Sequence, residues 1–367
     1  MLARYTTRLP VIVALLVTGM AGACTQRESL VIEKIEPAMG TVLQVTVPEQ
    51  EAPRLDLAAY TARTRAEAVQ ELVDGALPGS EIRKLNETAH QVRIPVSKDT
   101  LRLLKLAADY HDRSHGAFDV TMEHLEDLWG FRNQPPPPQP LSGSLVRAAL
   151  SGAGMEKVAF DEDGMVRFTA SGVRIGLLGL AGGYAIDTGI KELREQGLAD
   201  VLVNLGGTSI RCLGSAGPDR PWQVPLYNPA AVEERLGTIS LMAGGAMATR
   251  RLYDGYVRIE GKRYGQLIDP RTGYPAEGTL GVSILAPTAT EAYALATALL
   301  VAGLEEAPAI LAGFPRCQAL IIPDRQPLEL WVTDGFGPNL TVQPRFKDQV
   351  NVLSRQAREA AEPPSGE

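Results

Sequence analysis

Two clusters of glycine follow strand-like runs and offer backbone amides to a phosphate group. They comprise Gly176, Gly179, Gly182 and Gly183 ahead of a helix-like segment, and Gly206-Gly207 after residues 201–205. At a helix N-terminus, amide groups with no side chain above them can approach an anionic oxygen closely. Tight packing of a helix on a strand explains the same glycines equally well, and their spacing misses the GxGxxG dinucleotide fingerprint. A nicotinamide or flavin oxidoreductase is therefore only a minor alternative.

Other chemically capable residues give weaker indications. Four histidines stand at positions 90, 111, 115 and 124. His111 and His115 have i,i+4 spacing, but Gly116 follows directly and is expected to end the helix, so they do not indicate a metal site. Asp119 and Asp187 could form a carboxylate pair, but capping of helices and turns is the simpler explanation. Arg250-Arg251 has two interpretations: a pair of solvated surface charges, or guanidinium groups that fork onto phosphate oxygens.

The most specific element is the loop Ile268-Asp269-Pro270-Arg271-Thr272-Gly273-Tyr274-Pro275. It resembles the signature of the FAD:protein FMN transferases, the ApbE-type periplasmic lipoproteins. Further matches follow in the family's order over residues 38–330. They are Met39-Gly40-Thr41, Ser80-Glu81-Ile82 with Leu85-Asn86, Gly116-Ala117-Phe118-Asp119 with Thr121, Trp129-Gly130-Phe131, Gly183-Tyr184-Ala185-Ile186-Asp187, Gly206-Gly207, Ala248-Thr249 and Ala296-Thr297.

The resemblance implies a defined reaction. FMN moves from FAD to a threonine or serine hydroxyl of a partner redox protein, AMP leaves, and Mg²⁺ activates the pyrophosphate. Such a transfer needs charge neutralisation and in-line positioning more than covalent chemistry from the enzyme. The sequence therefore assigns no single catalytic residue.

The resemblance also assigns residues by position. The flavin-nucleotide contacts are Met39, Ala117, Phe118, Asp119, Gly176, Gly182 and Ile268, with Arg250 and Arg251 added by the phosphate hypothesis. The implied Mg²⁺ ligands are the Gly179 carbonyl, the Thr297 hydroxyl and the residue at the family's carboxylate position, which here is Tyr293. Mg²⁺ prefers carboxylate oxygens, and a phenol with a pKa near 10 replaces them poorly. We expect a weakened Mg²⁺ site.

Other departures gather at the same chemistry. Ala76 stands where the family has an aromatic residue, Gly176 replaces an aspartate, and Gln266 replaces a histidine before the Asp-Pro loop. Arg250-Arg251 replaces a Ser-Gly pair. The sequence thus predicts a transferase whose activity is weakened or lost. The alternative is a non-catalytic flavin-nucleotide-binding or maturation protein on the same fold.

The N-terminus has the pattern of an export signal. Arg4 and Arg8 precede an apolar run over residues 9–20, and Ala21-Gly22-Ala23 precedes Cys24. Small residues directly before a cysteine are typical of bacterial lipoproteins, so we expect residues 1–23 to be removed and Cys24 to be lipidated. A plain secretory signal and an uncleaved anchor are the alternatives. The expected location is the periplasmic side of a bacterial membrane.

The intervening segments predict an α+β fold, a mixed α/β single large domain with two lobes around a flavin-nucleotide cleft. Strand-like runs cover residues 42–47, 173–178, 201–205 and 282–286, and helical patterns cover 55–75, 100–112, 181–196 and 290–304. Prolines at 135–138 mark an exposed loop. We expect the domain to span residues 24–350 and a disordered tail to follow over 351–367.

Charge and cysteine content exclude other classes of protein. The 36 Lys and Arg against 43 Asp and Glu give a net charge of −7. Without a basic cluster, nucleic acid is not an expected partner. Three cysteines exclude a dense disulfide framework, although Cys212 and Cys317 could pair in an oxidising compartment.

Overall fold

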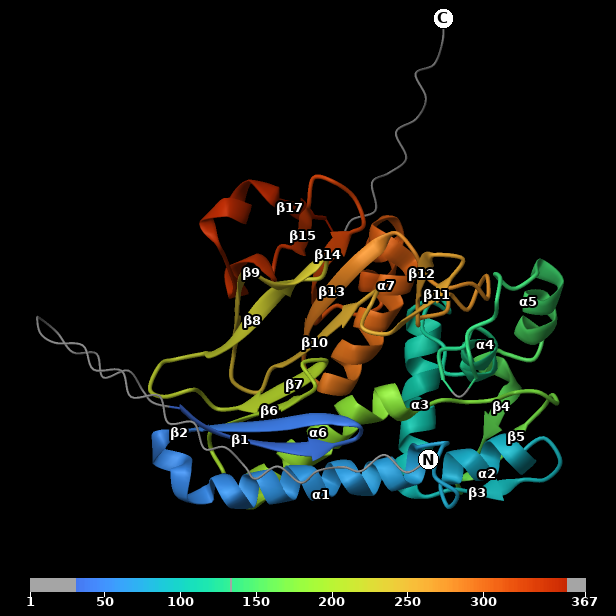
Figure 1. Ribbon diagram of the computed structural model, residues 1–367. Coiled ribbons are helices and arrows are strands. Elements are labelled where there is room, and N and C mark those ends of the chain that lie inside the picture. The colour runs from blue at the N-terminus through green and yellow to red at the C-terminus, as the bar shows by residue number, and fades with distance from the viewer. Residues whose placement is uncertain (1–30, 133, 355–367) are drawn as a thin grey trace, which may run out of the picture.

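A nine-stranded sheet forms the centre of the protein (Figure 1). The computed structural model describes residues 31–132 and 134–354. In order across the sheet, the strands are β1 (Val31–Ala38), β2 (Thr41–Pro48), β6 (Val201–Leu205), β7 (Ser209–Leu213), β10 (Ala246–Arg251), β13 (Thr279–Ala286), β14 (Gln318–Pro323), β15 (Leu330–Thr333) and β17 (Val350–Leu353). Neighbours pair antiparallel except β15 and β17, which are parallel.

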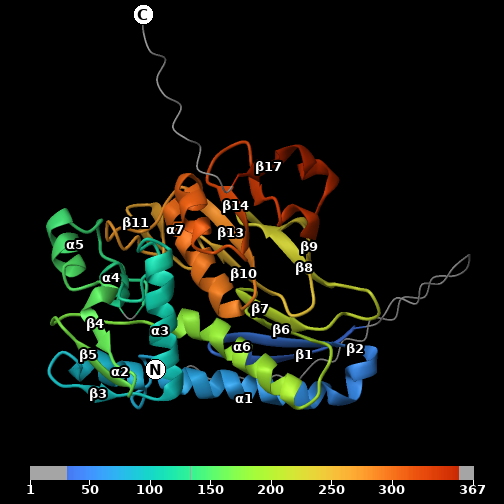
Figure 2. The same cartoon turned by 180° about the vertical axis from the view of Figure 1, so that it is seen from behind.

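Three long helices cover one face of this sheet, as Figure 2 shows from behind. They are α1 (Leu55–Val73), α6 (Leu178–Glu195) and α7 (Ala289–Ala312). Among the described residues, α7 alone is long and apolar enough to cross a membrane. It nevertheless packs against β10, β13 and α6, and most of its apolar side chains are buried in the core. These contacts are those of a core helix.

The opposite face is covered by a smaller sheet of β8 (Trp222–Asn228), β9 (Ala231–Leu241) and β16 (Leu340–Val342). Trp222, Leu236 and Phe336 fill the core between the two sheets. Cys212 belongs to this core, whereas Cys317 belongs to the core on the helical side. The large sheet therefore separates the two thiols, and they do not form a disulfide.

A second lobe lies beside the helical face of the sheet and is built mostly from short elements (Figure 1). It contains α2 (Glu81–Thr88), α3 (Lys98–Arg113), α4 (Glu123–Leu128), α5 (Gly143–Leu150), β3 (Ile94–Pro95), β4 (Val158–Phe160) and β5 (Met165–Phe168). The ribbon β11 (Tyr256–Ile259) and β12 (Lys262–Gly265) precedes the Asp-Pro loop. 3₁₀ turns cover Glu49–Arg54, Met155–Lys157, Gly337–Asn339 and Pro344–Gln349. The expected α+β fold with two lobes is confirmed.

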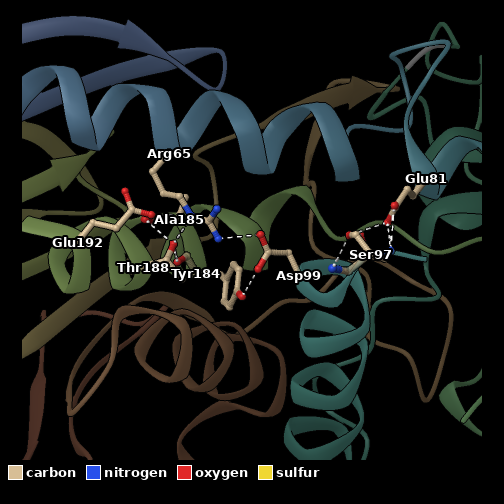
Figure 3. A network of polar contacts seen from close by, with 9 residues as sticks. Arg65, Glu81, Ser97, Asp99, Tyr184, Ala185, Thr188 and Glu192 are labelled. Atoms are coloured by element: carbon tan, nitrogen blue, oxygen red, sulfur yellow. Dashed lines mark hydrogen bonds and ion pairs between the residues drawn. The ribbon is translucent and has the colours of Figure 1, made fainter. Parts of the chain in front are cut away.

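A polar network joins α1, α3 and α6 (Figure 3). Arg65 on α1 pairs with Asp99 on α3 at 2.7 Å, and its Nε donates to the Thr188 hydroxyl at 2.9 Å. The Tyr184 hydroxyl donates to the other oxygen of Asp99 at 2.7 Å. Burial together with this hydrogen bond raises the pKa of Tyr184 to about 12, so the phenol keeps its proton. The network fixes α6, whose N-terminal end forms part of the site described below.

Most predicted elements are present, with two differences. The predicted strand at 173–178 is wrong: its backbone pairs with no strand among the described residues before α6 begins at Leu178. Instead, Ile175 N–H donates to the Asn86 side chain at 2.8 Å and Gly176 N–H donates to the Val120 carbonyl at 2.8 Å. The ordered domain continues through β17 to Leu353, beyond the expected boundary at 350. The predicted signal at 1–23, Cys24 and residues 355–367 of the predicted tail lie outside the described residues.

Candidate functional site

A cleft lies where the start of α6, α4, β10 and the segment before Asp269 meet. It consists of two adjoining cavities of about 330 Å³ and about 120 Å³. The residues that line both are Glu126, Arg132, Leu178, Gly179, Leu267 and Tyr293. Two compartments joined at a polar neck suit a dinucleotide, because such a ligand has two ring systems joined by a charged pyrophosphate.

Most of the predicted nucleotide contacts line this cleft. Met39, Gly182 and Arg250 line the larger cavity, and Ala117, Phe118, Asp119, Gly176 and Ile268 line the smaller one. Met39 occupies the two-residue β1–β2 turn with a φ of 49°, beside Gly40 with a φ of 73°. Two adjacent residues with positive φ match the tight turn that antiparallel strands favour. This turn places Met39 at the edge of the sheet that faces the cleft.

Arg250 and Arg251 point in different directions because successive side chains of a strand alternate. Arg250 lines the larger cavity and is only 6% exposed. Arg251 lines neither cavity, and its Nε pairs with Asp254 at 2.6 Å. The structure therefore places the first arginine in the cleft and the second outside it.

The glycines before and within α6 occupy different structural positions. A Cβ at Gly183 would come within 2.8 Å of the Ala289 backbone, so this residue is required for close packing of α6 on α7. Gly179 and Gly182 instead line the cleft. At Gly176, the Arg132 guanidinium lies 3.6 Å from where a Cβ would stand. The packing interpretation is confirmed for Gly183, whereas phosphate binding by Gly179 and Gly182 stays a prediction.

The three positions that the resemblance assigned to a metal lie together. Gly179, Tyr293 and Thr297 all line the smaller cavity. The Thr297 hydroxyl donates to the Tyr293 carbonyl at 2.9 Å, one turn earlier on α7. The Tyr293 ring lies 5.0 Å from the Arg250 guanidinium carbon. None of these side chains is a carboxylate, and within residues 31–132 and 134–354 no group of three or more His, Cys, Asp or Glu could hold a metal.

Two charged cleft residues escaped the sequence analysis. Arg132 pairs with Glu123 at 2.8 Å and with Glu126 at 3.2 Å. Loss of hydration in the enclosed cleft raises the pKa of Glu126, and the nearby Arg132 and Arg250 oppose this rise. Arg132 directly follows the Trp129-Gly130-Phe131 motif, and that position was the one available signal. Arg132 thus has two carboxylate partners, so its positive charge is more than neutralised within the cleft.

Hydrogen bonds bring the distant motifs together at the cleft. The indole N–H of the fully buried Trp129 donates to the Gly273 carbonyl in the Asp-Pro loop at 3.1 Å. Asn86 on α2 donates to Glu123 at 2.7 Å and to the Ile175 carbonyl at 3.0 Å. The residues that match in sequence therefore serve mainly to hold the walls of the cleft.

His111 contacts the predicted flavin segment. Its Nδ1 lies 3.1 Å from the Phe118 carbonyl and 3.3 Å from an Asp119 oxygen. The other Asp119 oxygen accepts from the Thr121 backbone N–H at 2.7 Å. Hydrogen bonding to Asp119 raises the pKa of His111, although partial burial opposes this. Asp119 thus stabilises a turn and favours the protonated form of His111.

Comparison with known proteins identifies this arrangement. The sequence profile of the ApbE family matches residues 39–321. The chain belongs to the ApbE family. Among its relatives, the FAD:protein FMN transferase of Klebsiella pneumoniae is 26% identical over 302 residues, which cover 81% of this chain and 86% of the relative. The transferase of Treponema pallidum is 29% identical over 336 residues, covering 87% and 92%.

Solved structures agree. The ApbE protein of Thermotoga maritima superposes with a TM-score of 0.76 at 28% identity, covering 85% of this chain and all of that one. The flavin transferase ApbE of Vibrio cholerae has a TM-score of 0.75 at 24% identity and supports the fold. The resemblance inferred from the Asp-Pro loop is confirmed.

This ApbE-family chain also has a larger cavity of about 460 Å³ away from the cleft, between the β1–β2 edge of the sheet and β8. It is lined by residues such as Val31, Leu202 and Trp222, with Glu33 and Arg220 as its charged members. None of the predicted nucleotide contacts lines this separate cavity. The cleft beside the start of α6 is therefore the candidate site.

Proposed function

We propose that this ApbE-family protein binds FAD in the cleft and transfers FMN to a threonine or serine hydroxyl of a partner redox protein. The observation that carries the proposal is that eight predicted nucleotide contacts line one two-compartment cleft, with the buried Arg250 in the wall of the larger compartment. The names of the relatives support the same reaction.

The transfer balances as a substitution at phosphorus. The acceptor oxygen bonds to the phosphorus of the FMN half, and the bond from that phosphorus to the bridging oxygen breaks. AMP leaves with the bridging oxygen, and the hydroxyl proton passes to solvent. The acceptor then carries FMN through a phosphodiester. The task of the protein is to bind the two halves of FAD and hold the pyrophosphate in line with the incoming hydroxyl.

The residues present support binding better than rapid turnover. Gln266 lines the larger cavity, where the resemblance expects a histidine. A carboxamide does not accept a proton near neutral pH, so Gln266 cannot act as a general base. Its side chain lies over Gly255, where a Cβ would come within 2.2 Å of the amide oxygen.

The chemistry of the residues at the implied Mg²⁺ position does not fit that ion. A phenol, a threonine hydroxyl already donating to a carbonyl, and one backbone carbonyl provide no negative oxygen. Arg250 adds a positive charge 5.0 Å from the Tyr293 ring, which repels a second cation. A weakened Mg²⁺ site therefore remains our expectation, and no step above depends on the ion.

These two departures favour a second candidate function. A protein that binds the flavin nucleotide without turnover, as a carrier or maturation factor, needs the cleft but neither a base nor a metal. Incubation of the purified protein with FAD, Mg²⁺ and an acceptor protein that carries a suitable threonine separates the two. AMP release matched by a covalent FMN mass increase on the acceptor supports transfer. FAD binding without either product supports the carrier.

We also propose that the protein is exported and anchored by lipid at Cys24 on the periplasmic side of a bacterial membrane. The support is the sequence pattern of residues 1–24. The partners are then FAD, a redox subunit at the same membrane and the membrane itself. Mass spectrometry of the mature protein tests this, since an N-terminal cysteine that carries lipid is expected and Cys24→Ala should release the protein from the membrane fraction.

A further inference from the structure

Arg250 is a buried cation without an ion-pair partner among the described residues. It is 6% exposed, and its Nε is buried with no hydrogen-bond partner. Among the described residues, no carboxylate lies within ion-pair distance of its guanidinium. The guanidinium instead lies over the face of the Tyr293 ring. An aromatic face attracts a cation but accepts no N–H hydrogen bond of full strength. Burial of such a group costs free energy that something must offset.

Neighbouring arginines do not share this property. Arg132, which lines both cavities, has Glu123 and Glu126 as partners. Arg211 on β7 also has a buried Nε without a hydrogen-bond partner, but its Nη1 pairs with Asp187 at 2.6 Å. Glu126 lines the same cavity and feels the charge of Arg250, but it lies beyond ion-pair distance and is engaged by Arg132. Of these three arginines, Arg250 is therefore the one whose guanidinium has no carboxylate partner among the described residues.

The surroundings of Arg250 suit an anion. The larger cavity that Arg250 lines also exposes Gly179 in the first turn of α6, an 18-residue helix with no side-chain cap at its N-terminus. Amide groups at this end carry partial positive charge. The Tyr293 hydroxyl fills the space over Gly179, and the ring of Tyr293 lies against the guanidinium of Arg250.

We propose that the Arg250 guanidinium takes the role of a divalent cation and binds the FAD pyrophosphate directly, so that this protein binds FAD without metal. The inference rests on the proposed function, because it takes the cleft to be the FAD site. A guanidinium can donate two parallel hydrogen bonds to phosphate oxygens and remains charged at every working pH. Tyr293 in place of a carboxylate and Arg250 in place of a serine are then two parts of one change, because the arginine supplies the positive charge that the bound cation would supply.

The test is a titration of the mature protein with FAD, followed by calorimetry, in EDTA and again in excess Mg²⁺. We expect the same Kd in both solutions. Arg250→Gln should weaken FAD binding about tenfold or more, because it removes charge-assisted hydrogen bonds. Arg251→Gln is the matched control, since the neighbouring side chain is identical in type but lies outside the cleft, and its Kd should stay within about twofold of the parent. Riboflavin, which lacks phosphate, should bind the parent and Arg250→Gln equally.

Each alternative outcome has a distinct meaning. FAD binding in Mg²⁺ that disappears in EDTA would overturn the inference and leave the proposed function standing. Equal losses in the Arg250 and Arg251 variants would also overturn it, because a general charge effect would explain both. FAD binding in neither solution would refute the proposed function itself.

Arg250→Lys guards against a folding defect. Lysine keeps the positive charge but cannot donate two parallel hydrogen bonds, so the FAD affinity of this variant should fall between those of the parent and Arg250→Gln. Melting curves of the unliganded proteins check folding, and loss of the uncompensated charge should leave the Tm of Arg250→Gln at or above that of the parent.

Discussion

The Tyr293 hydroxyl lies so close over Gly179 that a Cβ at this glycine would stand 2.2 Å from the phenolic oxygen. The two positions are therefore sterically coupled: a large side chain at 293 requires glycine at 179. One residue belongs to α7 and the other to the first turn of α6, so this contact also sets how the two helices approach at the cleft.

Gly179→Ala should lower the free energy of unfolding by about 1–3 kcal/mol, the usual cost of overpacking. Urea denaturation measures this. Tyr293→Ala removes the clashing ring, so the double variant should recover most of the loss attributed to the clash, as a double-mutant cycle would show. Gly189→Ala on the same helix is the control, because its nearest atom would lie at an ordinary 3.7 Å. That control should be neutral or stabilising by up to about 1 kcal/mol. An equal loss in both alanine variants would contradict the coupling.

Asp187 connects α6 to the start of α7. Its two oxygens accept the backbone N–H groups of Ala289 at 2.9 Å and Thr290 at 3.0 Å, and one also pairs with Arg211. Asp187→Ala leaves two amides and a partly buried guanidinium unsatisfied, so we expect a loss of about 2–3 kcal/mol in stability. Glu277→Ala, which breaks the exposed pair with Lys262, should cost less than about 1 kcal/mol by the same measurement. Similar losses for the two variants would refute the capping role.

The His111–Asp119 contact should make stability depend on pH. Because the folded pKa of His111 is raised above its ordinary value, protonation favours the folded state. This stabilisation is fully present below the unfolded pKa of about 6.5 and is lost as pH rises through the folded pKa. The Tm difference between the parent and His111→Gln should therefore be largest near about pH 5 and shrink toward about pH 9. A difference that stays constant over this range would show that the imidazole charge contributes nothing.

Local sequence patterns were sufficient for the parts of the site that depend on turns. The Met39-Gly40 turn and the Asp-Pro loop have backbone conformations that only a few residue types adopt, so their sequence identifies them. Strand β8 was missed because Pro225 interrupts its pattern, although the strand pairs with β9 in the layer over the sheet. The extended run before Gly176 resembles a strand locally, and only the distant Asn86 side chain decides that it is not one.

The distribution of charge in the cleft could not be predicted from local sequence patterns, because it depends on where side chains from different elements lie. Arg250 and Arg251 are chemically alike in sequence, and the exact limits of β10 decide which one enters the cleft. Arg132 and Glu126 lie six residues apart on either side of the end of α4, and their pairing became apparent only from the orientation of that helix. Charge balance at a site is a property of side chains from several elements, so it requires the fold.

Restoring a carboxylate should strengthen the Mg²⁺ site, which we expect to be weakened in this protein. Tyr293→Asp places a negative oxygen one turn before Thr297 and beside Gly179, which gives Mg²⁺ the hard ligand it prefers. Mg²⁺ at about a hundredfold excess over its Kd would then stabilise the variant by about 2.7 kcal/mol. Thermal denaturation with and without Mg²⁺ measures this, and the parent should show no shift. Arg250 would compete for the new carboxylate, so Tyr293→Asp combined with Arg250→Gln should bind Mg²⁺ more tightly than Tyr293→Asp alone. If Mg²⁺ raises the Tm of the parent by as much as it raises the Tm of Tyr293→Asp, then Tyr293 leaves the cation site intact.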